Sequence, residues 1–258
     1  MRGIKMLNSC QVNHSSLKIF AKLTSYRGII VKHTEITEIA SMRILICAAT
    51  SLEIQPLINK IPDLPFSGHS VDTLITGIGA MHTAYELTAE IHRERPDLIL
   101  LAGIGGSFDP IEPPGEVYFI QKDVTADLGV RENNEWKDLF DMKLLDRNTA
   151  PYSEGFLYND YPIPPIDNLL KGTAVTVNQV TTDPVHILSM VKKYHPDVES
   201  MEGAAVHYVC IKEKIPFIHL RAVSNTIGQR NKAKWDIQLA VKNLNEAAEK
   251  VITSIISK

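Results

Sequence analysis

Short apolar runs alternate with amphipathic segments along the chain after residue 41. Runs of consecutive apolar residues predict buried strands, and segments whose apolar residues recur every three or four positions predict helices. The predicted strands are 44–48, 73–76, 97–102, 117–122, 173–177 and 217–223, and the predicted helices are 52–61, 81–93, 184–194, 204–212 and 234–256. This alternation predicts an α/β fold in which a mixed, mostly parallel sheet is flanked by helices.

Two stretches lack this alternation. Residues 130–170 are rich in Pro, Asp and Asn and are predicted to be irregular loops, which often carry substrate contacts. Residues 1–41 show no sustained period and contain no apolar stretch long enough for a signal peptide. We therefore predict that Met42 is the natural start, that 1–41 is a disordered or spurious extension, and that 42–258 is a single domain. A real tail or a short targeting segment is the alternative for 1–41.

Composition narrows the class of protein. The chain has 258 residues, of which 44% are hydrophobic, so it can bury a full core and is not wholly disordered. A formal net charge of −3 argues against a general nucleic-acid binder, and the apolar runs are too short to cross a membrane. Cys10, Cys47 and Cys210 are widely spaced, so they predict no disulfide framework and fit a reducing cytoplasm.

Glycine-rich turns follow two predicted strands, at the edge where ligands bind in open α/β sheets. The turn 77–79 begins like a dinucleotide fingerprint, but His82 stands where the third glycine would be. A tight strand-to-helix turn is therefore its simpler interpretation. The segment 103–107 can bring backbone N–H groups close to a phosphate or a sugar, or it can be a structural turn. It does not match the GxxxxGK[ST] loop of nucleoside triphosphatases.

Three polar side chains follow other predicted strands. Glu202 lies beside Gly and Ala residues that make room for a ligand, and a carboxylate there can accept both hydrogen bonds from the vicinal diol of a ribose. Asn225 follows the strand 217–223, and its amide can both donate and accept. Glu53 comes shortly after the first strand, where a solvated helix residue is the simpler interpretation if the residue is taken alone.

The nine histidines show no spacing typical of metal ligands. His82, His92 and His207 lie on helical patterns and are interpreted as packing or surface residues. The sequence therefore predicts no metal site, and no Ser/His/Asp arrangement can be argued from it.

Taken together, these segments resemble the nucleoside phosphorylase and nucleosidase family. The resemblance runs from Met42 to the C-terminus and is carried by 77–79, 102–106, 198–205 and 220–225. It implies a three-layer nucleoside phosphorylase-like fold, a small-molecule nucleoside substrate, no cofactor and a homo-oligomer. Further motifs at 126–129, 137–142, 176–178 and 224–235 are similar to a subgroup of nucleosidases that use water and release hypoxanthine.

The resemblance also implies roles for individual residues. Glu53 would hold and deprotonate the attacking water, Glu202 would bind the ribose 2′- and 3′-hydroxyls above Met201, and Asn225 would bind the base and stabilise its developing negative charge. The remaining substrate contacts that it implies are Gly105, Gly106, Val180, Thr181 and Ser224.

Three further residues belong to the segments shared with the subgroup. Asp127 would serve the loop that is specific to it. Arg230 and Lys234 are either partners for a carboxylate at the far end of the substrate or solvated charges beside a helix.

Asn225 also indicates which of two purine bases, adenine or hypoxanthine, is released. Adenine-releasing members of the family have Asp at this position, which can accept from the exocyclic amine of adenine. Hypoxanthine carries a carbonyl instead, and an amide NH₂ can donate to that oxygen or to N7. Asn225 therefore predicts hypoxanthine as the base released.

Three alternatives remain. A phosphorylase needs cations beside its phosphate, and 105–109 brings no Arg or Lys. An adenine-releasing nucleosidase acting on methylthioadenosine or S-adenosylhomocysteine would have Asp at position 225. A non-catalytic nucleoside sensor is disfavoured because both Glu53 and Glu202 are present.

Overall fold

The computed structural model describes residues 41–64, 68–132, 135–162, 166–229 and 231–257. The predicted extension 1–41 lies outside the described residues except for Ser41. The strands are β1 (Arg43–Ala48), β2 (Ser70–Ile75), β3 (Leu98–Ser107), β4 (Val117–Asp123), β5 (Gly129–Glu132), β6 (Glu135–Asp138), β7 (Leu157–Tyr158), β8 (Leu169–Thr176), β9 (Val198–Ser200) and β10 (Phe217–Thr226). The α-helices are α1 (Ser51–Lys60), α2 (Ala80–Arg93), α3 (Pro184–Tyr194), α4 (Gly203–Glu213) and α5 (Ile237–Ile256), with short 3-10 turns η1 (Ile61–Asp63) and η2 (Lys232–Lys234).

Eight of the described strands form one mixed sheet in the order β10-β4-β8-β9-β3-β1-β2, with β7 paired to β4. Parallel pairs join β1 to β2 and β3, β10 to β3, and β8 to β4 and β9. Antiparallel pairs join β10 to β4, β9 to β3 and β7 to β4. Because β10 pairs with both β3 and β4, the strands β3, β10, β4, β8 and β9 close into a ring.

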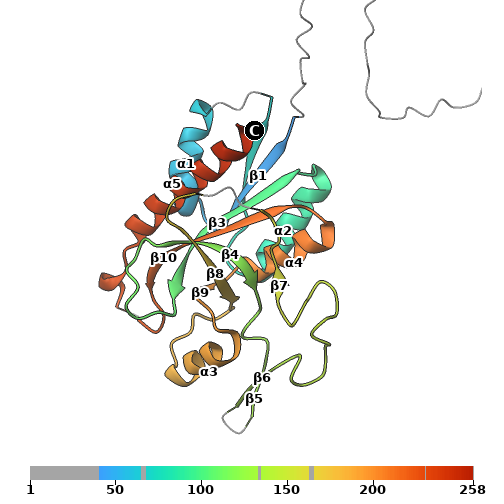
Figure 1. Ribbon diagram of the computed structural model, residues 1–258, viewed down its shortest axis with the longest axis vertical. Helices are drawn as coiled ribbons and strands as arrows, with labels where there is room; N and C mark the ends of the chain where they lie inside the picture. Colours follow the sequence, from blue (N-terminus) through green and yellow to red (C-terminus); the bar gives the residue numbers. More distant parts are fainter. Residues whose placement is uncertain (1–40, 65–67, 133–134, 163–165, 230, 258) are drawn as a thin grey trace, which may run out of the picture. The chain divides into compact units, whose positions relative to one another are not determined.

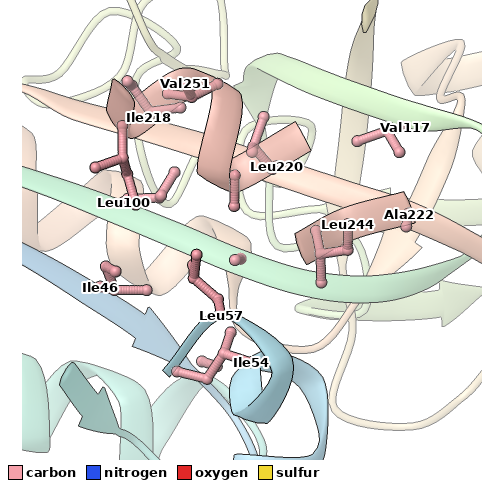
Figure 2. Close-up of a cluster of buried hydrophobic side chains, with 14 of the residues drawn as sticks. Ile46, Ile54, Leu57, Leu100, Val117, Ile218, Leu220, Ala222, Leu244 and Val251 are labelled. Carbon is pink, nitrogen blue, oxygen red and sulfur yellow. The ribbon is translucent and has the colours of Figure 1, made fainter. Parts of the chain in front are cut away.

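Helices cover both faces of the sheet. In Figure 1, α1 and α5 lie together on one face, and α2 and α4 lie together on the other. Side chains alternate across a strand, so Ile44 and Ile46 of β1 pack with α1 and α5, whereas Leu45 and Cys47 pack with α2 and α4. Figure 2 shows Ile54 of α1 and other apolar side chains of the first face gathered around the sheet. The predicted three-layer α/β fold with a mixed, mostly parallel sheet is confirmed.

The predicted elements differ from the observed ones mainly at their ends. The strand predicted over 97–102 continues through its glycines to Ser107, because the segment pairs with β10 and then with β9. Similarly, the strand predicted over 217–223 continues to Thr226. The last helix starts at Ile237 rather than at residue 234, because the side chain of Asp236 accepts from Leu239 N and caps the helix.

The segment 130–170 is only partly irregular. It contains the hairpin formed by β5 and β6, and also strand β7. Lys193 of α3 pairs with Asp138 and Asp141, which ties this segment to the rest of the domain. None of the helices in the described ranges has both the length and the apolar character of a membrane span.

Candidate active site

A cavity of about 350 Å³ opens where β1, β3 and β10 end. These strands run parallel to one another, so their carboxyl ends meet at one edge of the sheet. Mainly apolar side chains line the cavity, together with a few polar groups, which is typical of a small-molecule site. Eight of the predicted site residues line it: Glu53, Gly105, Gly106, Val180, Met201, Glu202, Ser224 and Asn225.

Glu53 is fixed at the start of α1 by a capping box. Its Oε2 accepts from Thr50 N at 2.9 Å and from Thr50 Oγ1 at 3.0 Å. Its Oε1 accepts from the backbone N–H of Ile104 in β3 at 3.1 Å. The residue is only 6% exposed, and its carboxylate lies on the wall of the cavity. A carboxylate has about four acceptor positions, so Glu53 can still accept from a water or a substrate.

Glu202 lies just before α4 and is held by two donors. Its Oε1 accepts from Gly79 N at 3.1 Å, and its Oε2 accepts from Arg221 Nη2 at 3.1 Å. The turn 77–79, interpreted from the sequence as a simple strand-to-helix turn, therefore also orients a residue of the site. Because both oxygens are anchored, the carboxylate faces the cavity in one orientation.

Arg221 lies behind Glu202 and is 1% exposed. Its Nη1 donates to the carbonyl of Ile104 at 3.3 Å. Gly103 makes room for it, since a Cβ there would lie 2.1 Å from Nη1 and 3.0 Å from Glu53 Oε1. Arg221 thus supplies one positive charge beside the two carboxylates of Glu53 and Glu202, and this excess of negative charge suits a cationic, oxocarbenium-like sugar.

Asn225 and Ser224 lie at an irregularity of β10, where the register with β3 shifts between Val223 and Asn225. The Asn225 Oδ1 accepts from Ser224 Oγ at 2.8 Å, and its Nδ2 donates to the carbonyl of Thr226 at 3.0 Å. An amide NH₂ carries two protons, so one remains for a ligand. If the amide were flipped, Oδ1 would face the carbonyl oxygen of Thr226, and two acceptors would repel each other. The amide therefore offers an N–H donor to a ligand.

The glycines of β3 allow close contact with neighbouring strands. A Cβ on Gly105 would lie 2.6 Å from Val198 Cγ1 and 2.7 Å from the carbonyl of Glu199. These glycines therefore continue a strand and line the cavity with backbone, rather than forming the turn that the sequence allowed.

Thr181 is not brought to the cavity wall. It is buried, and its backbone N–H donates to Glu199 Oε1 at 3.1 Å. Glu199 itself lines the cavity, and burial raises the pKa of its carboxyl. The glutamate, rather than the threonine, is thus the polar group that this part of the chain presents to a ligand.

Part of the subgroup motif 224–235 lines the cavity, including Gly228, Gln229 and Trp235, whereas Asp127 and Lys234 do not. Asp127 accepts from the backbone N–H groups of Asn178 and Gln179 and so shapes the loop before Val180. Lys234 belongs to η2 and does not line the cavity, and Arg230 lies outside the described residues.

Arg221 and Glu199 carry no role predicted from the sequence. A signal was present for Arg221, because a charged residue in the middle of a strand that is otherwise apolar needs a buried partner. Glu199 precedes the assigned Glu202 by three residues, and no spacing distinguishes it from a solvated residue. The segment 105–109 contains no Arg or Lys. A cation nevertheless lies close to this segment, because Arg221 of β10 reaches the carbonyl of Ile104 in β3.

Comparisons with known proteins agree with this fold. The model of the phosphorylase superfamily matches residues 43–257. The futalosine hydrolase of Streptomyces coelicolor is 31% identical over 193 residues, which cover 70% of this chain and 77% of that protein. The futalosine hydrolase of Thermus thermophilus is 28% identical over 187 residues, which cover 69% of this chain and 80% of that protein.

Among solved structures, the 5′-methylthioadenosine/S-adenosyl homocysteine nucleosidase of Campylobacter jejuni aligns with a TM-score of 0.66 at 21% identity. The alignment covers 83% of this chain and 98% of that one, which shows a shared fold. Because the family model matches most of the sequence, the chain belongs to the phosphorylase superfamily.

Proposed function

We propose that the chain hydrolyses the N-glycosidic bond of futalosine, releasing hypoxanthine and dehypoxanthine futalosine in menaquinone biosynthesis. The observation that carries this proposal is the convergence of Glu53, Glu202 and Asn225 on one cavity. The relatives named futalosine hydrolase support the choice of substrate within the superfamily.

Glu53 activates the attacking water. As the bond to the base breaks, the sugar becomes oxocarbenium-like, and a water on the opposite face of the ring attacks the anomeric carbon. Glu53 holds this water and takes its proton. The donors from Thr50 and Ile104 keep the carboxylate pointing at the cavity, so it is oriented before the substrate arrives.

Glu202 binds the ribose. Its anchored carboxylate accepts from the 2′- and 3′-hydroxyls, and Met201 packs under the sugar. The guanidinium of Arg221 balances the charge of Glu202 while leaving the remaining lone pairs of the carboxylate free for the diol.

Asn225 binds the base. Its free amide proton donates to N7 or to the 6-carbonyl of hypoxanthine, where negative charge develops as the base leaves. An amide cannot protonate the leaving base, so the base departs as an anion held by hydrogen bonds or takes its proton from water.

Phosphate is a poor alternative nucleophile in this cavity. No Lys or Arg is among the described residues that line it, whereas three glutamates are. The guanidinium of Arg221, behind the cavity wall, is already paired with Glu202. A phosphate dianion would therefore meet net negative charge.

Incubation with futalosine, inosine and methylthioadenosine, each with and without phosphate, tests the proposal. We expect hypoxanthine from futalosine at a rate that does not depend on phosphate, measured by chromatography of the free base. Adenine from methylthioadenosine as the main product, or strict dependence on phosphate, would contradict it.

We also propose a cytoplasmic homo-oligomer, a dimer or larger. The exposed apolar side chains of Met81 and Tyr85 on α2 support a contact with a second copy. Light scattering coupled to size-exclusion chromatography tests this, and a monomeric mass at micromolar concentration would contradict it.

A further inference from the structure

A chain of hydrogen bonds runs from Arg221 into the interior, away from the cavity. The Nε of Arg221 donates to His219 Nε2 at 2.8 Å. His219 Nδ1 lies 3.0 Å from His207 Nε2, and His207 Nδ1 lies 2.9 Å from the carbonyl oxygen of Leu157. Both imidazoles are fully buried. The chain thus links β10, α4 and β7 to the guanidinium that holds Glu202.

The two ends of this chain determine where each proton lies. Arginine only donates, so His219 Nε2 must be an acceptor and its proton must lie on Nδ1. That proton points at His207 Nε2, which must therefore also be an acceptor. The remaining proton of His207 lies on Nδ1 and points at a carbonyl oxygen, which only accepts. Every donor in the chain then meets an acceptor, and both imidazoles are neutral.

The surroundings favour neutral imidazoles. Burial lowers the pKa of His207 to about 4 and lowers the pKa of His219 as well, and the charge of Arg221 acts in the same direction. Gly203 allows this packing, because a Cβ there would lie 2.5 Å from His219 Cε1.

The same histidines and Asp123 form a group that offers three possible metal ligands close together. A metal on His219 Nδ1 would require the proton of that neutral ring to move to Nε2. That proton would then face the Arg221 Nε–H, placing two donors 2.8 Å apart. The hydrogen-bond chain and a metal are therefore alternatives, and the guanidinium favours the chain.

We infer that His219 and His207 are positioning residues for ribose recognition: their one-directional hydrogen-bond relay orients Arg221, and through it Glu202. This inference rests on the proposed function, because it deepens the account of how the same site binds its sugar. Without an acceptor at His219 Nε2, the buried Arg221 Nε–H would have to turn to find another partner. Its Nη2 would then leave the Glu202 carboxylate.

The first test needs only the wild-type full-length protein labelled with ¹⁵N-histidine. Two-bond ¹H–¹⁵N correlation spectra at neutral pH distinguish the tautomers of each ring. We expect both buried histidines to carry their proton on Nδ1. An Nε2-protonated ring or an imidazolium at either position would overturn the relay, and so would a stoichiometric divalent metal found by elemental analysis of the purified protein.

The second test compares two variants of nearly equal length, His219→Gln and His219→Met. The glutamine amide oxygen can accept from Arg221, whereas the methionine sulfur is at best a weak acceptor. We expect His219→Met to raise KM for futalosine about tenfold or more. His219→Gln should restore most of the loss, and kcat should change less than KM in both variants.

A substrate without the 2′-hydroxyl distinguishes positioning from general loss of structure. If His219 acts through Glu202, the His219→Met change should raise KM much less for 2′-deoxyfutalosine than for futalosine. Equal losses with both substrates, or no rescue by glutamine, would overturn the positioning role. If the wild type does not cleave futalosine at all, the proposed function fails, while the tautomer measurement still decides whether the relay exists.

Discussion

Replacing Glu53 by Gln should separate catalysis from binding in this site. The carboxylate accepts three hydrogen bonds, two from Thr50 and one from the backbone N–H of Ile104. The amide has one oxygen, so its NH₂ group must face a backbone N–H, either that of Ile104 or that of Thr50. The substitution therefore removes the general base and also leaves one buried donor without its partner.

The two consequences have different sizes. A buried donor without an acceptor costs about 1–3 kcal/mol in the free energy of unfolding, and losing a negative charge in the first turn of α1 adds about 0.3–1 kcal/mol. We therefore expect Glu53→Gln to lower stability by about 1–4 kcal/mol and still to fold. Loss of a general base lowers kcat by about 10²–10⁴-fold. KM should stay near the wild-type value because the sugar and the base keep their contacts.

Hypoxanthine release from futalosine and urea unfolding measure the two effects on the same samples. Glu90→Gln is the matched control, because Glu90 is also buried and pairs with Arg43 and Arg93, outside the cavity. It should lower stability while leaving kcat unchanged. A Glu53→Gln enzyme with wild-type kcat would refute the assignment of the base, and a loss of activity equal to that of the control would attribute the effect to folding.

Three further changes test other parts of the reasoning. Asn225→Asp should lower hypoxanthine release and raise the relative rate with methylthioadenosine, and an unchanged substrate ratio would contradict the argument about the base. Gly105→Ala should lower the melting temperature and activity together, because its Cβ would lie 2.6 Å from Val198 Cγ1; a wild-type melting curve would argue against this close contact. Burial raises the pKa of the Asp123 carboxyl from 3.8 to about 7. Between these pH values the folded chain keeps a proton that the unfolded chain releases. The contribution of Asp123 to the free energy of unfolding therefore falls as pH rises from about 4 to 7. The stability of the wild type relative to Asp123→Asn should therefore decrease over that range in urea titrations, and a difference that grows with pH would be inconsistent with a raised pKa.

Local patterns determined most of the elements of this fold. The helix predicted over 184–194 has its observed bounds, because Pro184 stands at its first position and the side chain of Asp183 caps it. The order of strands and helices was enough to predict three layers, and the motifs around Glu202 and Asn225 indicated the family. These are features of short segments, in which propensity and periodicity act between neighbouring residues.

Only the tertiary structure decided how distant segments meet in the site. The glycines after Ala102 have low strand propensity, and their pairing with β10 and β9 is what extends β3 to Ser107. The same pairing brings Arg221 across Gly103 to the carbonyl of Ile104, where it holds Glu202 in place. Arg221 and Ile104 are 117 positions apart in the chain, and the energy of their contact comes from burial and cross-strand hydrogen bonds that no local pattern encodes.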